Sequence, residues 1–197
     1  MSGKKNAPVR ERPTAAQLEA ELTRTKYRAR YRTVLRSTVY SLVIVAAAAV
    51  LVATLWLPVL QIYGSSMTPT LTDGDIVVSV KQSAFEQGDV VAFYYNNKIL
   101  IKRVIAGPGD WVDVKEDGTV FVNGAELDEP YLVEKAFGDC DIDLPYQVPD
   151  GRIFVMGDHR SVSVDSRNTA VGCVAQEQIV GKMVFRVWPL SGLGSIG

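Results

Sequence analysis

Two side chains that could hydrolyse a peptide or ester bond are far apart in this sequence of 197 residues. Ser66 lies in the segment 62–71 (IYGSSMTPTL), and Lys102 lies among apolar residues in the segment 99–105 (ILIKRVI). A serine hydroxyl is a poor nucleophile until a base takes its proton. A lysine can act as that base when burial in apolar surroundings favours its neutral form. The two residues therefore suggest serine–lysine hydrolysis.

A third polar segment, 157–167 (GDHRSVSVDSR), could orient both groups and also offers a different base. It contains His159, the only histidine, together with Asp158 and Asp165. A Ser-His-Asp triad needs its aspartate on the far side of the imidazole from the serine, whereas these three residues lie in one short segment. We therefore expect His159 to be a structural loop residue and keep a Ser-His hydrolase as an alternative.

Taken together and in this order, the three segments resemble bacterial type I signal peptidases, membrane-anchored proteases that remove signal peptides from exported proteins. The resemblance extends from about residue 61 to residue 189. It implies that Ser66 is the nucleophile, that Lys102 is the general base, and that Ser163 hydrogen-bonds and orients the lysine amine. The family usually has Asn at the position of His159, so the resemblance implies no catalytic role for this histidine.

The resemblance also assigns supporting roles to charged and small residues around the pair. Ion pairs are expected to fix the 157–167 loop and leave Lys102 without a carboxylate partner; they would involve Arg103, Asp158, Asp165 and Arg167. Gly64 occupies the position of the family's second oxyanion donor but has no hydroxyl, which leaves Ser65 or a main-chain N–H as candidates. A pocket for small substrate side chains is expected to be lined by Ile62, Met67, Leu71 and Ile101.

The apolar run before Ser66 predicts a transmembrane helix over residues 37–60, because residues 39–60 contain no charge and about 20 apolar residues span a bilayer core. A cleaved signal peptide would have a shorter run, roughly 7–15 residues, ending at a small-x-small site. This run ends in the bulky segment 56–60 (WLPVL). Residues 1–36 hold ten Lys/Arg and three Asp/Glu, and such basic flanks stay cytoplasmic. Residues 61–197 should then be extracytoplasmic.

The basic tail, residues 1–36, begins with a polar stretch, and we expect residues 1–13 to be disordered because they are charged and poor in apolar side chains. Thr14 and Gln17 fit a helix capping box. The basic helix that follows would suit contact with anionic lipid heads, although a solvated tail is an equal alternative.

Residues 61–197 are predicted to form one β-rich domain. Short β-prone runs are bounded by Gly, Asn and Pro at 75–80, 89–95, 99–105, 111–114, 119–122, 153–156 and 179–188. Asp117-Gly118 predicts a hairpin turn, and Asn123-Gly124 predicts another. Cys140 and Cys173 could form a disulfide or remain free thiols. One histidine and two separated cysteines do not make a zinc site, so neither a metal nor a cofactor is expected.

These observations predict a mostly β protein with one N-terminal transmembrane helix. The expected function is a membrane-bound endopeptidase that removes N-terminal signal peptides from exported pre-proteins after small residues. Its expected partners are those signal peptides and the lipid bilayer, with no nucleic acid. Two alternatives are a membrane-anchored binding module without catalysis and the Ser-His hydrolase that uses His159.

Overall fold

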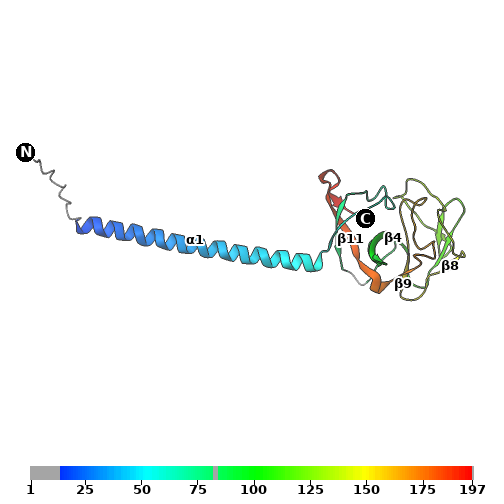
Figure 1. The fold of residues 1–197 in the computed structure, drawn as a ribbon, viewed down its shortest axis with the longest axis horizontal. Coiled ribbons are helices and arrows are strands. Elements are labelled where there is room, and N and C mark those ends of the chain that lie inside the picture. Colours follow the sequence, from blue (N-terminus) through cyan, green and yellow to red (C-terminus); the bar gives the residue numbers. More distant parts are fainter. Residues whose placement is uncertain (1–13, 82–83, 197) are drawn as a thin grey trace, which may run out of the picture. The chain divides into compact units, whose positions relative to one another are not determined.

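The computed structural model describes residues 14–81 and 84–196, which fall into two compact units, Met1–Val52 and Ala53–Gly197. The first unit contains most of the N-terminal helix, and the second contains the end of that helix and all the β-strands described (Figure 1). The disorder expected for residues 1–13 concerns residues outside this description. The prediction of a mostly β protein with one N-terminal apolar helix is confirmed.

One continuous helix, α1 (Ala15–Trp56), contains both the basic stretch and the apolar run. The expected capping box is present, because the Thr14 N–H donates to Gln17 Oε1 at 2.9 Å and the Gln17 N–H donates to Thr14 Oγ1 at 3.4 Å. The part Ala15–Leu51 is long and apolar enough to cross a membrane, and its most apolar stretch is not buried against the rest of the protein.

The end of the helix corrects the boundary that the sequence predicts. α1 ends at Trp56 rather than at Leu60, because Val59 and Leu60 belong instead to strand β1 (Val59–Gln61). Pro58, which lies between the two elements, accepts hydrogen bonds from the backbone N–H and the hydroxyl of Ser79. Hydropathy alone cannot separate the last turn of an apolar helix from a short apolar strand.

An antiparallel eight-stranded sheet forms most of the second unit. Its order is β1-β2-β11-β3-β4-β9-β10, with β12 paired to β11. The strands after β1 are β2 (Ile76–Val80), β3 (Val90–Tyr95), β4 (Lys98–Ala106), β9 (Arg152–Met156), β10 (Val174–Ala175), β11 (Ile179–Trp188) and β12 (Gly194–Ser195). Two short 3-10 helices, η1 (Gln176–Gln178) and η2 (Leu190–Gly192), flank β11.

A smaller four-stranded sheet has the order β7-β6-β5-β8. It contains β5 (Trp111–Val114), β6 (Val120–Val122), β7 (Ala125–Glu126) and β8 (Tyr146–Gln147). The predicted Asp117-Gly118 hairpin is confirmed, since Val114 pairs with Val120 across this turn. Gly118 has φ +85° and a Cβ there would lie 2.3 Å from the Ala136 nitrogen, so the turn requires glycine.

The register of the central strands places the two basic residues of β4. Lys102 pairs with Val91 of β3, and Arg103 pairs with Val90 of β3 and Met156 of β9. Since β9 ends at Met156, the polar loop 157–167 begins directly beside Arg103. Successive side chains of a strand point to opposite faces, so the sheet presents Lys102 and Arg103 on different sides.

Candidate active site

Ser66 lies in a turn that apolar side chains anchor to the core. The Met67 and Leu71 side chains are 2% and 0% exposed, and the Leu71 N–H donates to the Met67 carbonyl at 2.8 Å. Ser66, immediately before this anchor, is half-buried. The Lys102 amine donates a hydrogen bond to Ser66 Oγ at 2.6 Å. Two residues separated by 36 positions in the sequence are therefore in direct contact.

Lys102 is 3% exposed, and this burial lowers the pKa of its amine to about 8. Desolvation is the main cause because it penalises the charged form. Asp165 and Asp158 act in the opposite direction, and Arg167 lowers the pKa further. The amine is thus shifted toward the neutral form that a base requires.

Two buried arginine–aspartate pairs hold the loop that begins at Gly157. Arg103 donates to both carboxylate oxygens of Asp158, at 2.9 and 2.7 Å. Arg167 donates to both oxygens of Asp165, each at 2.9 Å, and the Gly157 N–H also donates to Asp165 at 2.9 Å. The structure therefore contains the ion pairs that the resemblance implies.

The start of this loop contacts the Ser66 backbone. The His159 N–H donates to the Ser66 carbonyl at 3.0 Å. A Cβ added at Gly157 would lie 2.5 Å from that carbonyl oxygen and 2.3 Å from Ser163 Oγ, so the loop backbone is packed tightly against the turn. His159 Nδ1 is buried and has no hydrogen-bond partner among the described residues. Without an aspartate on this nitrogen, the imidazole lacks the orienting group of a triad.

Ser163 differs from its expected role. The residue is 1% exposed, but its hydroxyl makes no hydrogen bond to any described residue, so the expected bond to the Lys102 amine is not formed. The turn 159–163 explains this position, because the Ser163 N–H donates to the His159 carbonyl at 3.1 Å and brings the side chain against Gly157. The Lys102 amine donates instead to the Ser66 hydroxyl.

The hydrogen bonding of Gly64 excludes one candidate for the second oxyanion donor. Its N–H donates to Asp73 Oδ1 at 2.8 Å, and its φ of +92° is in the region that favours glycine. Because that N–H is already engaged, it is removed from the main-chain candidates. Ser65, the side-chain candidate, is exposed.

A cleft of about 820 Å³ contains Ser66 and Lys102. Residues 59–64 line one part of it and residues 97–102 line another. Three of the four expected pocket residues, Ile62, Met67 and Ile101, line this cleft. Leu71 does not, because it is 0% exposed and packs in the core with Met67 and Met183. A cleft of about 880 Å³ beside Arg103 and Lys182 includes neither Ser66 nor Lys102.

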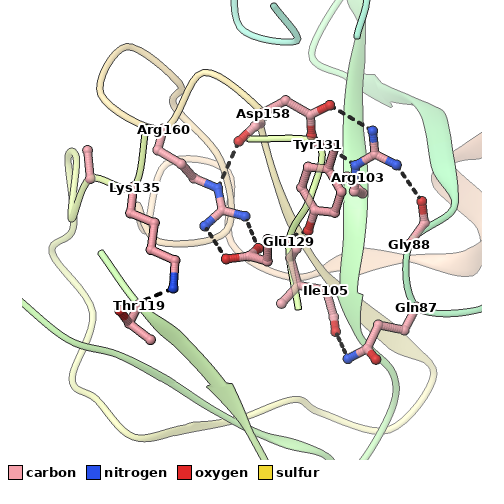
Figure 2. A network of polar contacts seen from close by, with 12 residues as sticks. Gln87, Gly88, Arg103, Ile105, Thr119, Glu129, Tyr131, Lys135, Asp158 and Arg160 are labelled. Carbon is pink, nitrogen blue, oxygen red and sulfur yellow. Dashed lines mark hydrogen bonds and ion pairs between the residues drawn. The ribbon is translucent and has the colours of Figure 1, made fainter. Parts of the chain in front are cut away.

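A buried polar network next to the site involves residues that the sequence analysis did not single out (Figure 2). Arg160 pairs with Glu129, the Tyr131 hydroxyl donates to Glu129 at 2.8 Å, and the Tyr131 ring lies 4.0 Å from the Arg103 guanidinium carbon. Thr70 donates to Asp158. Arg160 could have been noticed within the 157–167 motif, whereas Glu129 lies 31 residues away and carries no local signal.

The remaining reactive groups do not form a further centre. Cys140 and Cys173 are free, and burial raises the pKa of Cys173 to about 11. Within the described parts of the chain, no group of three or more His, Cys, Asp or Glu side chains could hold a metal ion.

Comparison with known proteins places this geometry in a family. Residues 35–188 match the family described as signal peptidase, peptidase S26. Signal peptidase IB from Staphylococcus aureus (strain COL) is 44% identical over 150 residues, which cover 66% of this chain and 77% of the relative. Thylakoidal processing peptidase 1 from Arabidopsis thaliana is 39% identical over 148 residues, covering 66% of this chain and 42% of the relative.

Among solved structures, a signal peptidase I from Enterococcus faecalis V583 is 30% identical, with a TM-score of 0.44, and covers 50% of this chain and 96% of that chain. The family match covers more than half of the sequence, and the relatives include bacterial enzymes of the same kind. This chain therefore belongs to the signal peptidase family, peptidase S26, as an enzyme of the bacterial type I group.

Proposed function

We propose that this enzyme is a membrane-bound endopeptidase that cleaves signal peptides from exported pre-proteins after small residues, with Ser66 as nucleophile and Lys102 as general base. The contact between the Lys102 amine and Ser66 Oγ at 2.6 Å carries this proposal. The lowered pKa of Lys102, about 8, supports it. At pH 7 a lysine with that pKa is neutral in roughly one molecule in ten, compared with about one in 2,500 for an ordinary lysine.

The reaction then proceeds through an acyl-enzyme. Neutral Lys102 accepts the Ser66 proton as Oγ attacks the carbonyl carbon of the residue before the scissile bond. The resulting ammonium donates that proton to the leaving amine as the peptide bond breaks. Lys102 next takes a proton from water as that water attacks the ester carbonyl, and it returns the proton to Ser66 Oγ when the ester bond breaks. A bound substrate that excludes water from the cleft favours the neutral amine further.

The composition of the cleft supports a preference for small side chains at the cleavage site. Ile62, Met67 and Ile101 contribute apolar side chains beside Ser66 and Lys102. Signal peptides carry small residues before the cleavage site, following the A-x-A pattern. We infer that these apolar walls accept small side chains at the −1 and −3 positions.

The orientation of the chain belongs to the same proposal. The basic residues that precede the apolar run of α1 favour a cytoplasmic N-terminus. Ser66 follows the end of α1 by ten residues, which span at most about 36 Å, so the substrate is expected close to the membrane. Protease added to intact protoplasts should degrade the C-terminal domain and spare an N-terminal tag. A protected C-terminal domain would reverse the orientation.

The decisive experiment is cleavage of one pre-protein by the detergent-solubilised full chain. Ser66→Ala and Lys102→Ala should each lose at least about 10²-fold in rate, as expected for the loss of a nucleophile or a general base. His159→Asn is the matched control in the adjoining loop and should remain within roughly tenfold of the native rate. Loss of activity in His159→Asn with retention in Lys102→Ala would favour the Ser-His alternative.

A substrate panel tests the specificity. One pre-protein carrying Ala, Ser, Leu or Phe at −1 should be cut efficiently only with the first two. Forcing a large side chain into a formed pocket costs roughly 1–3 kcal/mol. Misplacing the scissile carbonyl by about 1 Å adds a loss on the order of 10²-fold. Efficient cleavage after Leu or Phe would rule out the small pocket.

A further inference from the structure

We propose that Glu129 is a positioning residue for Ser66, acting through Arg160. Glu129 lies in the segment that connects β7 to β8, outside the cleft that contains Ser66 and Lys102. The inference rests on the proposed function, because it concerns the placement of the nucleophile. Glu129 touches neither Ser66 nor Lys102 and takes no proton in the reaction.

The Glu129–Arg160 pair is fully buried, with side-chain exposures of 0% and 1%. Both Glu129 oxygens accept hydrogen bonds from the two terminal nitrogens of Arg160. The remaining donor, Arg160 Nε, points to the Gly157 carbonyl at 3.1 Å. The guanidinium therefore joins Glu129 to the residue at which the polar loop begins, and its planar geometry restricts the orientation of that join.

That same loop segment holds the Ser66 backbone. The His159 N–H donates to the Ser66 carbonyl at 3.0 Å, and Gly157 packs against the same carbonyl. The other side of the segment is fixed by Arg167, which donates to the Arg160 carbonyl at 3.0 Å. Movement of Arg160 would consequently be transmitted to Ser66 through its immediate backbone contacts.

Tyr131 connects Glu129 to the strand that carries Lys102. Its hydroxyl donates to Glu129 Oε1 at 2.8 Å, while its ring packs under the Arg103 guanidinium at 4.0 Å. Burial and the nearby Glu129 carboxylate raise the Tyr131 pKa, so the hydroxyl keeps its proton and remains a donor. Figure 2 shows Glu129 between Arg160 on one side and Tyr131 with Arg103 on the other. The segment 129–131 therefore contacts both the loop behind Ser66 and the β4 neighbour of Lys102.

A role in stability alone does not account for this arrangement well. Apolar replacements of a buried ion pair are often neutral or stabilising, so burying two charges is a poor way to add stability. Directional bonds between rigid groups fix geometry instead. Here those bonds end on Gly157, whose neighbours include the Ser66 carbonyl.

The first test compares Glu129→Gln with Glu126→Gln in the full chain. Glu126 is the control because it lies only three residues earlier, in β7, but forms an exposed ion pair with Lys135, at 3.1 Å. Glu129→Gln should lower kcat by about 10- to 100-fold, since a displacement of about 1 Å can cost that much, while KM stays within about threefold. Glu126→Gln should keep native values. Each variant is assayed at a temperature at which its near-ultraviolet circular dichroism shows that it is folded.

A double-mutant cycle on kcat separates positioning from general support. Since Glu129 acts through Arg160, the double variant Glu129→Gln/Arg160→Gln should have the kcat of Arg160→Gln alone. Losses that multiply, or a native kcat in Glu129→Gln with only a lower melting temperature, would overturn the inference. If Glu129→Gln does not fold, Glu129→Asp replaces it in both measurements. The shorter carboxylate should give a smaller loss of kcat, and a native kcat there would equally overturn the inference.

Ser66→Ala distinguishes this inference from the proposed function on which it rests. Activity in Ser66→Ala would refute the function itself. An inactive Ser66→Ala combined with a native kcat in the folded Glu129 variant would refute only the positioning role.

Discussion

Lys102 and Arg103 are neighbours on β4 with similar burial, at 3% and 1% exposure. Their charged groups nevertheless have different hydrogen-bond partners. Arg103 donates to Asp158, to Thr70 and to the Gly88 carbonyl, and it stacks on Tyr131. The Lys102 amine donates to the Ser66 hydroxyl. Burial with a carboxylate preserves a charge, whereas burial without one lowers the pKa of an amine.

The pKa of Lys102 is lowered although two carboxylates lie nearby. Asp158 and Asp165 are close enough to raise the Lys102 pKa, but burial still dominates. Each aspartate is held by two hydrogen bonds to an arginine, Arg103 or Arg167. The arginines thus neutralise the loop carboxylates and allow the lysine to approach neutrality.

Exchanging the chemistry of the two neighbours gives the largest expected effect. Lys102→Arg keeps a positive charge but provides no base, because guanidinium does not lose its proton in proteins. The rate of pre-protein cleavage should fall by about 10²–10⁴-fold, nearly as far as in Lys102→Ala. In the native enzyme, kcat/KM should rise with pH through about 8 as the amine loses its proton. A pH-independent rate between 6 and 9 would contradict this assignment.

Breaking the Arg103 side of the comparison should mainly cost stability. Arg103→Met leaves the buried Asp158 carboxylate without its arginine, and such a loss typically costs about 3–5 kcal/mol. The control is Lys135→Met, because Lys135 pairs with Glu126 on the surface, where an ion pair contributes about 0–1 kcal/mol. Denaturant unfolding of both variants measures the difference. Equal losses of unfolding free energy would mean that the buried Arg103–Asp158 pair contributes no more to stability than the surface pair.

Removing the lysine charge should stabilise the protein while abolishing its activity. The pKa of Lys102 is about 8 when folded and 10.5 in the reference state, so keeping it protonated at pH 7 costs about 3 kcal/mol. Lys102→Met has a similar shape and avoids that cost. Its free energy of unfolding at pH 7 should therefore exceed the native value by up to about 3 kcal/mol.

The pH dependence of that difference provides its control. Between pH 8 and 10.5 the unfolded lysine binds more protons than the folded one, so the stability of the native protein rises with pH across this window. The advantage of Lys102→Met should be complete below pH 8 and disappear by about pH 10.5. A difference that is constant from pH 7 to pH 10.5 would show that it does not come from this proton.

The smallest expected effect concerns two serines of the polar loop. Ser163→Ala removes a buried hydroxyl that has no partner in the described structure, so the free energy of unfolding should rise by about 1 kcal/mol. Ser166→Ala is the matched change, since that hydroxyl donates to Gly172 and accepts from the Val155 N–H. It should lower the free energy of unfolding by about 1–3 kcal/mol. A destabilised Ser163→Ala would show that this hydroxyl has a partner in solution.

Features that depend on local pattern were predictable from the sequence. Short β-prone runs bounded by Gly, Asn and Pro located the main strands, and Asp117-Gly118 located a hairpin because the turn chemistry is encoded in two adjacent residues. The residue types suggested serine–lysine hydrolysis, whereas the individual roles of Ser66 and Lys102 came from the resemblance to a known family. Nothing in their separate segments determines that the distance between them is 2.6 Å.

Other features depend on packing between distant segments and were missed for that reason. β1 was mistaken for the end of the apolar helix because its first two residues, Val59 and Leu60, continue the apolar run. Leu71 is apolar, as a pocket residue should be, but it lies in the core. The position of the Ser163 hydroxyl depends on the turn 159–163. Glu129 meets Arg160 across 31 residues, a pairing that no periodicity records.

The crowding around Gly157 should limit which residues can replace this glycine. Even a methyl group there would lie 2.5 Å from the Ser66 carbonyl and 2.3 Å from the Ser163 hydroxyl. Relief would require shifting the Ser66 backbone, because that neighbour is not the flexible tip of a side chain. In a saturation library selected for secretion, position 157 should therefore retain only glycine, while the exposed Gly124, which has open space around its Cα, accepts alanine more often despite its positive φ.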